Sequence, residues 1–139
     1  MQHAALCYRE SFPGAAEVLL ITSRDTGRWV LPKGWPKKGE CGSETALREA
    51  LEEAGVEGTA APDSAGLYAY DKVMPGDVIL PCIVTVHPVE VSWLRHEFPE
   101  RAVRQREWFL TDAAADAVDE PELKAILANF SRDAVRGGL

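Results

Sequence analysis

The sequence predicts one α+β domain, in which several short strands are interleaved with few helices. Apolar and β-branched runs such as residues 17–22 recur along the chain, and turns rich in Pro and Gly separate them. Residues 44–54 and 121–130 instead repeat apolar residues at helical spacing. The chain has 139 residues, 46% of them hydrophobic, which suits a single globular domain over residues 1–139.

The N-terminal part is expected to consist mostly of strands. Ala4–Arg9 alternates weakly between apolar and polar residues, and Glu17–Thr22 is a compact β-branched run, so both are candidate strands. Residues 11–14 between them, Ser-Phe-Pro-Gly, have the composition of a turn. A short strand is expected at Trp29–Leu31, and it should end at Pro32 because proline cannot donate to a sheet ladder.

A helix is expected from about Glu44 to Ala54. Ser43 is its candidate N-cap, and Gly55 is a candidate for the left-handed residue that follows a helix.

Two strands are expected next, at Gly66–Val73 and Val78–Val86, with residues 71–77 as an exposed hairpin end. Glu107–Leu110 is the last candidate strand. Thr111 and Asp112 are then candidate caps of a short alanine-rich helix. A second C-terminal helix should begin at Pro121 and place these residues on one face: Leu123, Ile126, Leu127 and Phe130.

Composition narrows the class of protein. The net charge of −7 argues against a general nucleic-acid binder, which would carry a basic face. Phosphate substrates remain compatible with it, because cations held by carboxylates supply positive charge locally. No signal-like segment and no apolar run of membrane-spanning length is present, so a cytoplasmic protein without membrane contact is expected. Three widely spaced cysteines suit neither a disulfide framework nor a zinc site.

The segment from Gly34 to Val56 carries charged residues and glycines at the spacing G-x5-E-x7-R-E-U-x-E-E-x-G-U, where U is apolar. The specified positions are Gly34, Glu40, Arg48, Glu49, Glu52, Glu53 and Gly55. On a helical wheel the last three glutamates share an arc of about 100°, and Leu47 and Leu51 lie opposite, where the helix should pack on the sheet. Carboxylates four residues apart repel each other, so a purely structural helix has no evident reason to keep them. Oxygen ligands select hard cations, which predicts Mg²⁺ with Mn²⁺ as a substitute.

This spacing is the Nudix box, and over these residues the chain resembles the Nudix hydrolase family. The resemblance implies a Nudix-type α/β/α sandwich with a mixed sheet, and an enzyme that cleaves a phosphoanhydride bond with a metal-activated water. Glu49 and Glu53 are the best candidates for metal ligands, since they reach the same ion from successive turns. Glu52 is either a third ligand or the general base, and the family favours the base. The family also implies that the backbone carbonyl of Gly34 joins the metal ligands.

Three other box residues are expected to support the site. Arg48 is expected to assist catalysis by pairing with Glu40 or with a ligand, which would keep the carboxylates from splaying. Glu40 and Gly55 are expected to be structural.

Outside the box the chain resembles the branch that acts on diphosphoinositol polyphosphates and diadenosine polyphosphates. The similarity lies in residues 18–33, 104–109 and 119–123, and with the box it covers most of residues 4–130. It implies a small-molecule polyphosphate substrate, whose phosphates need several basic side chains. The candidates for binding the substrate are Arg24, Arg28, Lys33, Arg104 and Arg106.

Several alternatives stay open. Trp35 departs from the Gly-rich loop of that branch and is a candidate to stack on a base. Glu97, Glu100 and Glu107 are candidates for a further carboxylate ligand, and the sequence does not choose among them. The enzyme could instead be a pyrophosphatase for nucleotide sugars or nucleoside triphosphates. A non-catalytic ligand sensor with this fold is disfavoured, because all four box glutamates are present. The assembly could be a homodimer.

Overall fold

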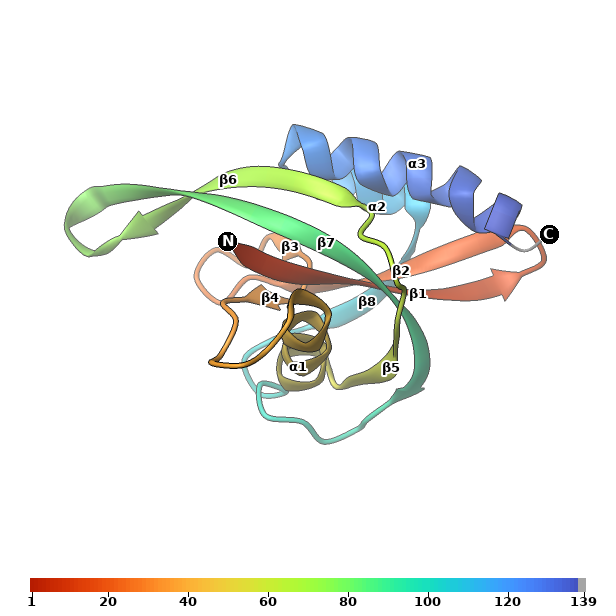
Figure 1. Cartoon of the computed structure of the whole chain (residues 1–139), viewed down its shortest axis with the longest axis horizontal. Coiled ribbons are helices and arrows are strands. Elements are labelled where there is room, and N and C mark those ends of the chain that lie inside the picture. The colour runs from red at the N-terminus through yellow and green to blue at the C-terminus, as the bar shows by residue number, and fades with distance from the viewer. Residues whose placement is uncertain (138–139) are drawn as a thin grey trace.

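The structure is a computed structural model that describes the backbone of residues 1–137 and the side chains of residues 1–130. A mixed sheet lies between one helix on one face and two helices on the other (Figure 1). This arrangement confirms the predicted α+β sandwich. Among the helices of the described residues, none is both long and apolar enough to cross a bilayer.

The sheet combines parallel and antiparallel neighbours. Its strands are β1 (Gln2–Phe12), β2 (Ala15–Thr22), β3 (Trp29–Val30), β4 (Lys33–Gly34), β5 (Val56–Ala60), β6 (Gly66–Met74), β7 (Val78–Leu94) and β8 (Arg106–Leu110). The central strand β1 runs antiparallel to β2 and parallel to β7. The path β3-β2-β1-β7-β5 is extended by β8 beside β2, β6 beside β7 and β4 beside β1. The helices are α1 (Gly42–Ala54), α2 (Thr111–Ala117) and α3 (Pro121–Gly137).

Successive side chains of β1 and β2 point to opposite faces of the sheet, so these two strands feed two cores. One core lies beneath α2 and α3, and it includes Leu6, Leu20, Leu123, Leu127 and Phe130. The other lies beneath α1, and it includes Cys7, Leu19, Ile21, Ala50 and Val89. The predicted apolar face of α3 is therefore confirmed, with Ile126 packed at its margin.

Several strands differ from the prediction. β1 continues through Phe12 into the predicted turn, and neither β4 nor β5 has a predicted counterpart. β5 contains Gly58, where a Cβ would collide with the carbonyl oxygen of Glu90 in the neighbouring strand. β7 continues past the predicted end at Val86 to Leu94. It passes through Pro88, which has no N–H to donate but still accepts a hydrogen bond from Ala61 at 2.9 Å.

The helix ends also differ in part from expectation. The N-cap of α1 is Cys41 rather than Ser43, and the Glu44 carboxylate accepts the backbone N–H of Cys41 at 2.9 Å. Gly55 ends the helix with a left-handed φ of 69°, as predicted. Thr111 is not the cap of α2 but its first, buried residue, following Leu110 at the cap position.

The face of α1 that packs on the sheet is displaced around the helix from the predicted centre at Leu47 and Leu51, although Leu47 still packs against the core. An alanine row is fully buried there (Ala46, Ala50 and Ala54), whereas Leu47 and Leu51 are only half-buried. Small side chains allow the helix to approach the sheet closely. The neighbouring stripe of the helix, with Glu49 and Glu53, is thereby drawn against the sheet as well.

Candidate functional site

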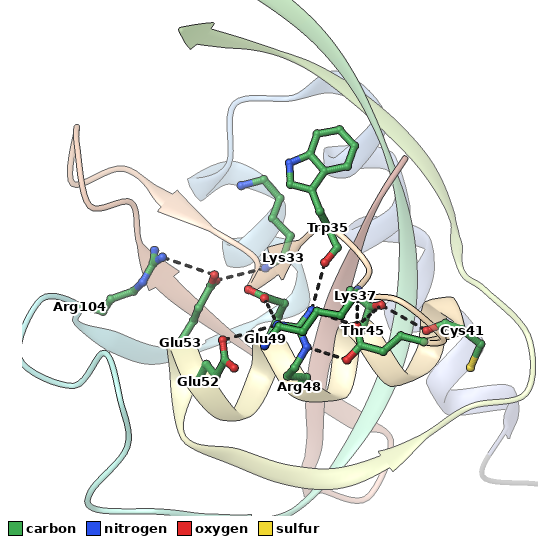
Figure 2. Close-up of polar contacts among 11 residues, drawn as sticks. Lys33, Trp35, Lys37, Cys41, Thr45, Arg48, Glu49, Glu52, Glu53 and Arg104 are labelled. Carbon is green, nitrogen blue, oxygen red and sulfur yellow. Dashed lines mark hydrogen bonds and ion pairs between the residues drawn. The ribbon is translucent and has the colours of Figure 1, made fainter. Parts of the chain in front are cut away.

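Two of the three clustered carboxylates on α1 are buried. Glu49 and Glu53 are 9% and 8% exposed, and Glu52 is half-buried (Figure 2). Glu53 Oε1 accepts the backbone N–H of Lys33 in β4 at 3.2 Å. Gly34, next in β4, makes room for Glu49, because a Cβ there would lie 2.5 Å from the Glu49 carboxyl carbon. Strand β4 and the helix therefore define the position of the two buried carboxylates together.

Burial changes the pKa of Glu53. It raises the pKa of Glu53 to about 8, and the adjacent Glu49 carboxylate raises it as well. Arg104 acts in the opposite direction, with its Nη2 at 3.6 Å from Glu53 Oε2. Without a cation, the two carboxylates thus avoid mutual repulsion by retaining a proton near neutral pH.

Arg48 holds the cluster from the side of the 35–41 loop. Its Nε donates to Glu40 Oε2 at 2.7 Å, and its Nη1 donates to Glu49 Oε1 at 2.6 Å. Its Nη2 donates to the carbonyl of Trp35 at 3.0 Å. The hydrogen bond from Arg48 lowers the pKa of Glu40 to about 2, so Glu40 stays ionised. The expected pairing of Arg48 with Glu40 is present, together with a contact to a ligand candidate.

The three carboxylates do not already enclose an ion. Among the described side chains, no group of three His, Cys, Asp or Glu residues is arranged to hold a metal. Glu49 and Glu52 lie near Arg48, whereas Glu53 contacts Lys33 and Arg104 (Figure 2). The donor chemistry nevertheless fits a hard cation, because the buried pair offers oxygen ligands and a divalent ion can replace the proton that they retain.

Two of the basic candidates surround one hollow. Arg24 and Arg104 both line a shallow cavity of about 380 Å³, together with Thr22, Ser23, Gly27, Ala102, Val103 and Gln105. Arg104 is fixed there, since its Nη1 donates to the carbonyl of Thr22 at 3.0 Å and its Nε donates to Glu100 at 2.9 Å. Arg104 also approaches Glu53, with its Nη2 at 3.6 Å from Oε2, so this arginine connects the lining of the hollow to the carboxylates.

Arg28 and Lys33 belong to a second polar region, near the start of α3. Arg28 Nη1 lies 3.0 Å from Glu120 Oε2, without hydrogen-bond geometry. The Lys33 ammonium lies 4.8 Å from the centre of the Tyr70 ring, and burial lowers its pKa. Lys33 interacts electrostatically with both Glu53 and Glu120. It therefore links this region to the carboxylates of α1.

Glu120 is a residue that the sequence reasoning missed. Its side chain is 9% exposed, and its Oε1 has no hydrogen-bond partner among the described residues. The available signal was an acidic residue directly before Pro121 at a helix start, which is typical of a capping position.

Arg106, another candidate for binding the substrate, contacts the C-terminal end of α1. Its Nη1 donates to the carbonyl of Ala54 at 2.7 Å, and its guanidinium lies over the Phe98 ring. It therefore holds the C-terminal end of α1, because that carbonyl has no donor within the helix.

Trp35 and the candidates for a further carboxylate ligand differ in how closely they contact the carboxylates of α1. The Trp35 side chain is exposed. Glu97 and Glu107 are exposed as well, whereas the Glu100 carboxylate contacts Arg104 beside Glu53. Among the three candidates for a further carboxylate, Glu100 is thus the one tied to the cluster.

The fold and the site define a domain that can present clustered carboxylates to a cation and basic side chains to phosphates. The sequence pattern that describes the NUDIX domain matches residues 2–130. The chain therefore belongs to the Nudix family, which confirms the family expected from the sequence.

Relatives of known sequence and structure agree with this assignment. "Nudix hydrolase 16, mitochondrial" of Arabidopsis thaliana is 31% identical over 120 residues, which cover 84% of this chain and 66% of that protein. "Nudix hydrolase 21, chloroplastic" of the same plant is 31% identical over 129 residues, covering 88% and 61%. This chain thus spans less than two thirds of the length of either relative. A crystal structure of the C. elegans Ap4A hydrolase has the same fold, with a TM-score of 0.70, 23% identity and 96% of both chains covered.

Proposed function

We propose that the chain hydrolyses a phosphoanhydride bond in a small polyphosphate, with a divalent cation held by Glu49 and Glu53. The observation that carries the proposal is the buried pair itself, in which burial and the neighbouring Glu49 carboxylate raise the pKa of Glu53. Mg²⁺ is the proposed ion and Mn²⁺ its substitute, because all the candidate ligands are oxygens. A bound cation would supply a water of lowered pKa and neutralise charge on the leaving phosphate.

The neighbouring residues would position the reaction. Arg48 fixes Glu49 at 2.6 Å and is itself fixed by Glu40, so the ligand is oriented before a cation arrives. Glu52 is the proposed general base. Among the three carboxylates it is the most exposed to water, and its contact with Arg48 is long, at 3.6 Å. The carbonyl of Gly34 remains a proposed further ligand.

The leading substrate class is a dinucleoside polyphosphate or a diphosphoinositol polyphosphate. Arg24 and Arg104 around the 380 Å³ hollow offer charge to phosphates that extend from the cleaved bond. The fold likeness to a protein named as an Ap4A hydrolase is compatible with the first of these substrates.

The Arg28–Lys33–Glu120 region favours a nucleotide over an inositol phosphate. Nη1 of Arg28 has no hydrogen-bond partner among the described residues and can donate to a phosphate of either substrate. The equally unpaired oxygen of Glu120, by contrast, can accept a hydrogen bond from an amino or ring N–H group of a base, which an inositol phosphate does not offer. The same observation supports the second candidate function, a pyrophosphatase for nucleoside triphosphates or nucleotide sugars.

The test is product release with Mg²⁺ from diadenosine polyphosphates, diphosphoinositol polyphosphates, ADP-ribose and nucleoside triphosphates. The wild type should cleave at least one of them, Glu52→Gln should be strongly impaired, and Glu10→Gln, at an exposed position on β1, should match the wild type. Tight binding without release from any substrate would instead indicate a sensor.

Glu120→Gln should raise KM for nucleotides and leave KM for a diphosphoinositol polyphosphate unchanged. Equal effects on both substrates would remove Glu120 from base recognition.

The cellular setting remains a proposal as well. A cytoplasmic location stays a proposal, and general nucleic-acid binding is disfavoured because the chain carries a net charge of −7. The names of the two plant relatives place those proteins in mitochondria and chloroplasts.

A further inference from the structure

Thr45 is a fully buried polar residue of α1, beside the pair formed by Arg48 and Glu40. Its Oγ1 lies 2.9 Å from Oε1 of Glu40 and 3.2 Å from the carbonyl oxygen of Cys41 (Figure 2). Both neighbours only accept hydrogen bonds, and a hydroxyl has a single proton to donate. The direction of that proton decides whether Thr45 serves the helix alone or also the residues that hold the carboxylates.

Distance and charge both favour Glu40 as the acceptor. A threonine inside a helix usually donates to the carbonyl four residues earlier, which here belongs to Cys41. That carbonyl already accepts the backbone N–H of Thr45 at 3.0 Å. The Glu40 carboxylate is closer, and it is ionised because the hydrogen bond from Arg48 lowers its pKa to about 2. A hydrogen bond to an ionised acceptor is stronger than one to a neutral carbonyl.

Glu40 is held from several sides. Its Oε1 accepts the backbone N–H of Lys37 at 2.9 Å and Nη2 of Arg48 at 3.0 Å, in addition to the Thr45 hydroxyl, and its Oε2 accepts Nε of Arg48 at 2.7 Å. Lys37 belongs to the loop before the helix, and Arg48 is the side chain that Glu40 itself orients. Thr45 is therefore the contact that fixes Glu40 to α1 independently of Arg48.

A fixed Glu40 sets the direction of the Arg48 guanidinium. This group is planar and rigid, so the position of Nη1 follows once Glu40 binds Nε and Nη2. Nη1 donates to Oε1 of Glu49 at 2.6 Å. Hydrogen bonds that orient a metal ligand in this way change metal affinity by about 10–100-fold.

We infer that Thr45 is a positioning residue of the proposed cation site, which acts through Glu40 and Arg48 on the Glu49 carboxylate. The inference rests on the proposed function, because Glu49 is a ligand only if the chain binds a divalent cation. A purely structural role would need only the shape of the Thr45 side chain, whereas positioning needs its hydroxyl proton. Substitutions that keep one and remove the other separate the two roles.

The first measurement is the Mg²⁺ affinity of the whole chain by calorimetry. Thr45→Val keeps the branched shape without the hydroxyl and should lower the affinity about 10-fold. Thr45→Ser keeps the hydroxyl and should bind Mg²⁺ nearly as the wild type does. Thr111→Val is the matched control and should also match the wild type, because Thr111 is 3% exposed but lies in α2, on the other face of the sheet (Figure 1).

The second measurement needs neither a cation nor turnover. In NMR spectra of the metal-free chain, the Nε–H of Arg48 should exchange slowly with water, because it donates to Glu40 and the Arg48 side chain is 19% exposed. Thr45→Val should accelerate this exchange severalfold, and Thr45→Ser should restore the wild-type rate. A change in helix packing alone would not distinguish these two variants by their hydroxyl.

Circular dichroism establishes that each variant is folded. If Thr45→Val does not fold, Thr45→Ala takes its place, since it differs from Thr45→Ser by the hydroxyl oxygen alone. Wild-type Mg²⁺ affinity or wild-type Arg48 exchange in the hydroxyl-free variant overturns the inference and leaves the proposed function intact. So does an equal loss in Thr45→Ser or in Thr111→Val. A wild type that binds neither Mg²⁺ nor Mn²⁺ contradicts the proposed function itself, and with it the site that Thr45 would position.

Discussion

Gly34 offers a direct test of how the Glu49 carboxylate is positioned. A Cβ at this position would lie 2.5 Å from Cδ of Glu49 and 2.7 and 2.8 Å from its two oxygens. Non-bonded carbon atoms are at their optimum at about 3.5 Å or more, so the carboxylate would have to move by about 1 Å in Gly34→Ala. The same movement would disturb the 2.6 Å hydrogen bond from Arg48.

We expect Gly34→Ala to lower activity much more than it lowers stability. The backbone of Gly34 is not in the left-handed region, so the cost is the overpacking against Glu49 alone, and unfolding free energy should fall by about 1–3 kcal/mol. A shift of about 1 Å in a positioned group can cost about 100-fold in rate, and kcat/KM should fall by that order. Urea unfolding measures the first quantity, and product release at several Mg²⁺ concentrations measures the second.

Gly42→Ala is the matched control, because it adds the same methyl group at an equally close approach. Its Cβ would lie 2.5 Å from the His3 ring and 3.0 Å from Nε2 of His87, at the other end of α1. Overpacking there should cost about 1–3 kcal/mol of stability and leave kcat/KM unchanged. The reasoning is refuted if Gly34→Ala keeps wild-type kcat/KM, or if the two variants lose activity to the same extent.

Three further predictions concern single residues. Glu52→Gln should lower kcat by about 10²–10⁴-fold with Mg²⁺ affinity nearly unchanged in calorimetry; an equal loss of Mg²⁺ affinity would make Glu52 a ligand. Because burial and Glu49 raise the pKa of Glu53 to about 8, a proton must leave before a cation binds, so Mg²⁺ affinity should rise up to about pH 8 and then level off. The folded state also binds this proton more tightly than the unfolded chain, so the metal-free protein should lose stability as pH rises from about 4.5 towards 8 in urea titrations; a flat profile in both experiments would contradict the shift. Leu127→Ala removes a fully buried side chain of α3 and should cost about 2–5 kcal/mol in urea unfolding, whereas a loss below about 1 kcal/mol would show that α3 packs loosely.

The parts of the site that follow local geometry could be predicted from the sequence. Glu49 and Glu53 are one helical turn apart wherever this helix forms, and Gly55 ends it with a φ of 69° because glycine enters the left-handed region without strain. The buried face of the helix could not be predicted in the same way. Burial depends on how closely the sheet approaches, and here the buried face is centred on the alanine row rather than on Leu47 and Leu51.

The roles of the distant basic residues lay beyond the sequence. Arg106 binds the carbonyl of Ala54, which is 52 positions earlier in the chain. Arg28 lies against Glu120 at the start of α3. In the sequence each of these arginines is equally suited to a phosphate, because composition does not show which carbonyl or carboxylate folding brings beside a guanidinium.

The C-terminal end of α1 is closed by the segment that follows β7. The carbonyls of Glu52 and Gly55 accept the backbone N–H groups of Glu100 and Arg95, in addition to the bond from Arg106 to Ala54. The helix that carries the carboxylates therefore ends on protein partners and does not depend on a bound cation for its shape. In small metal-dependent domains, by contrast, metal binding and folding occur together. If a divalent cation binds to Glu49 and Glu53 as proposed, loading the site and folding the chain would therefore be separate events.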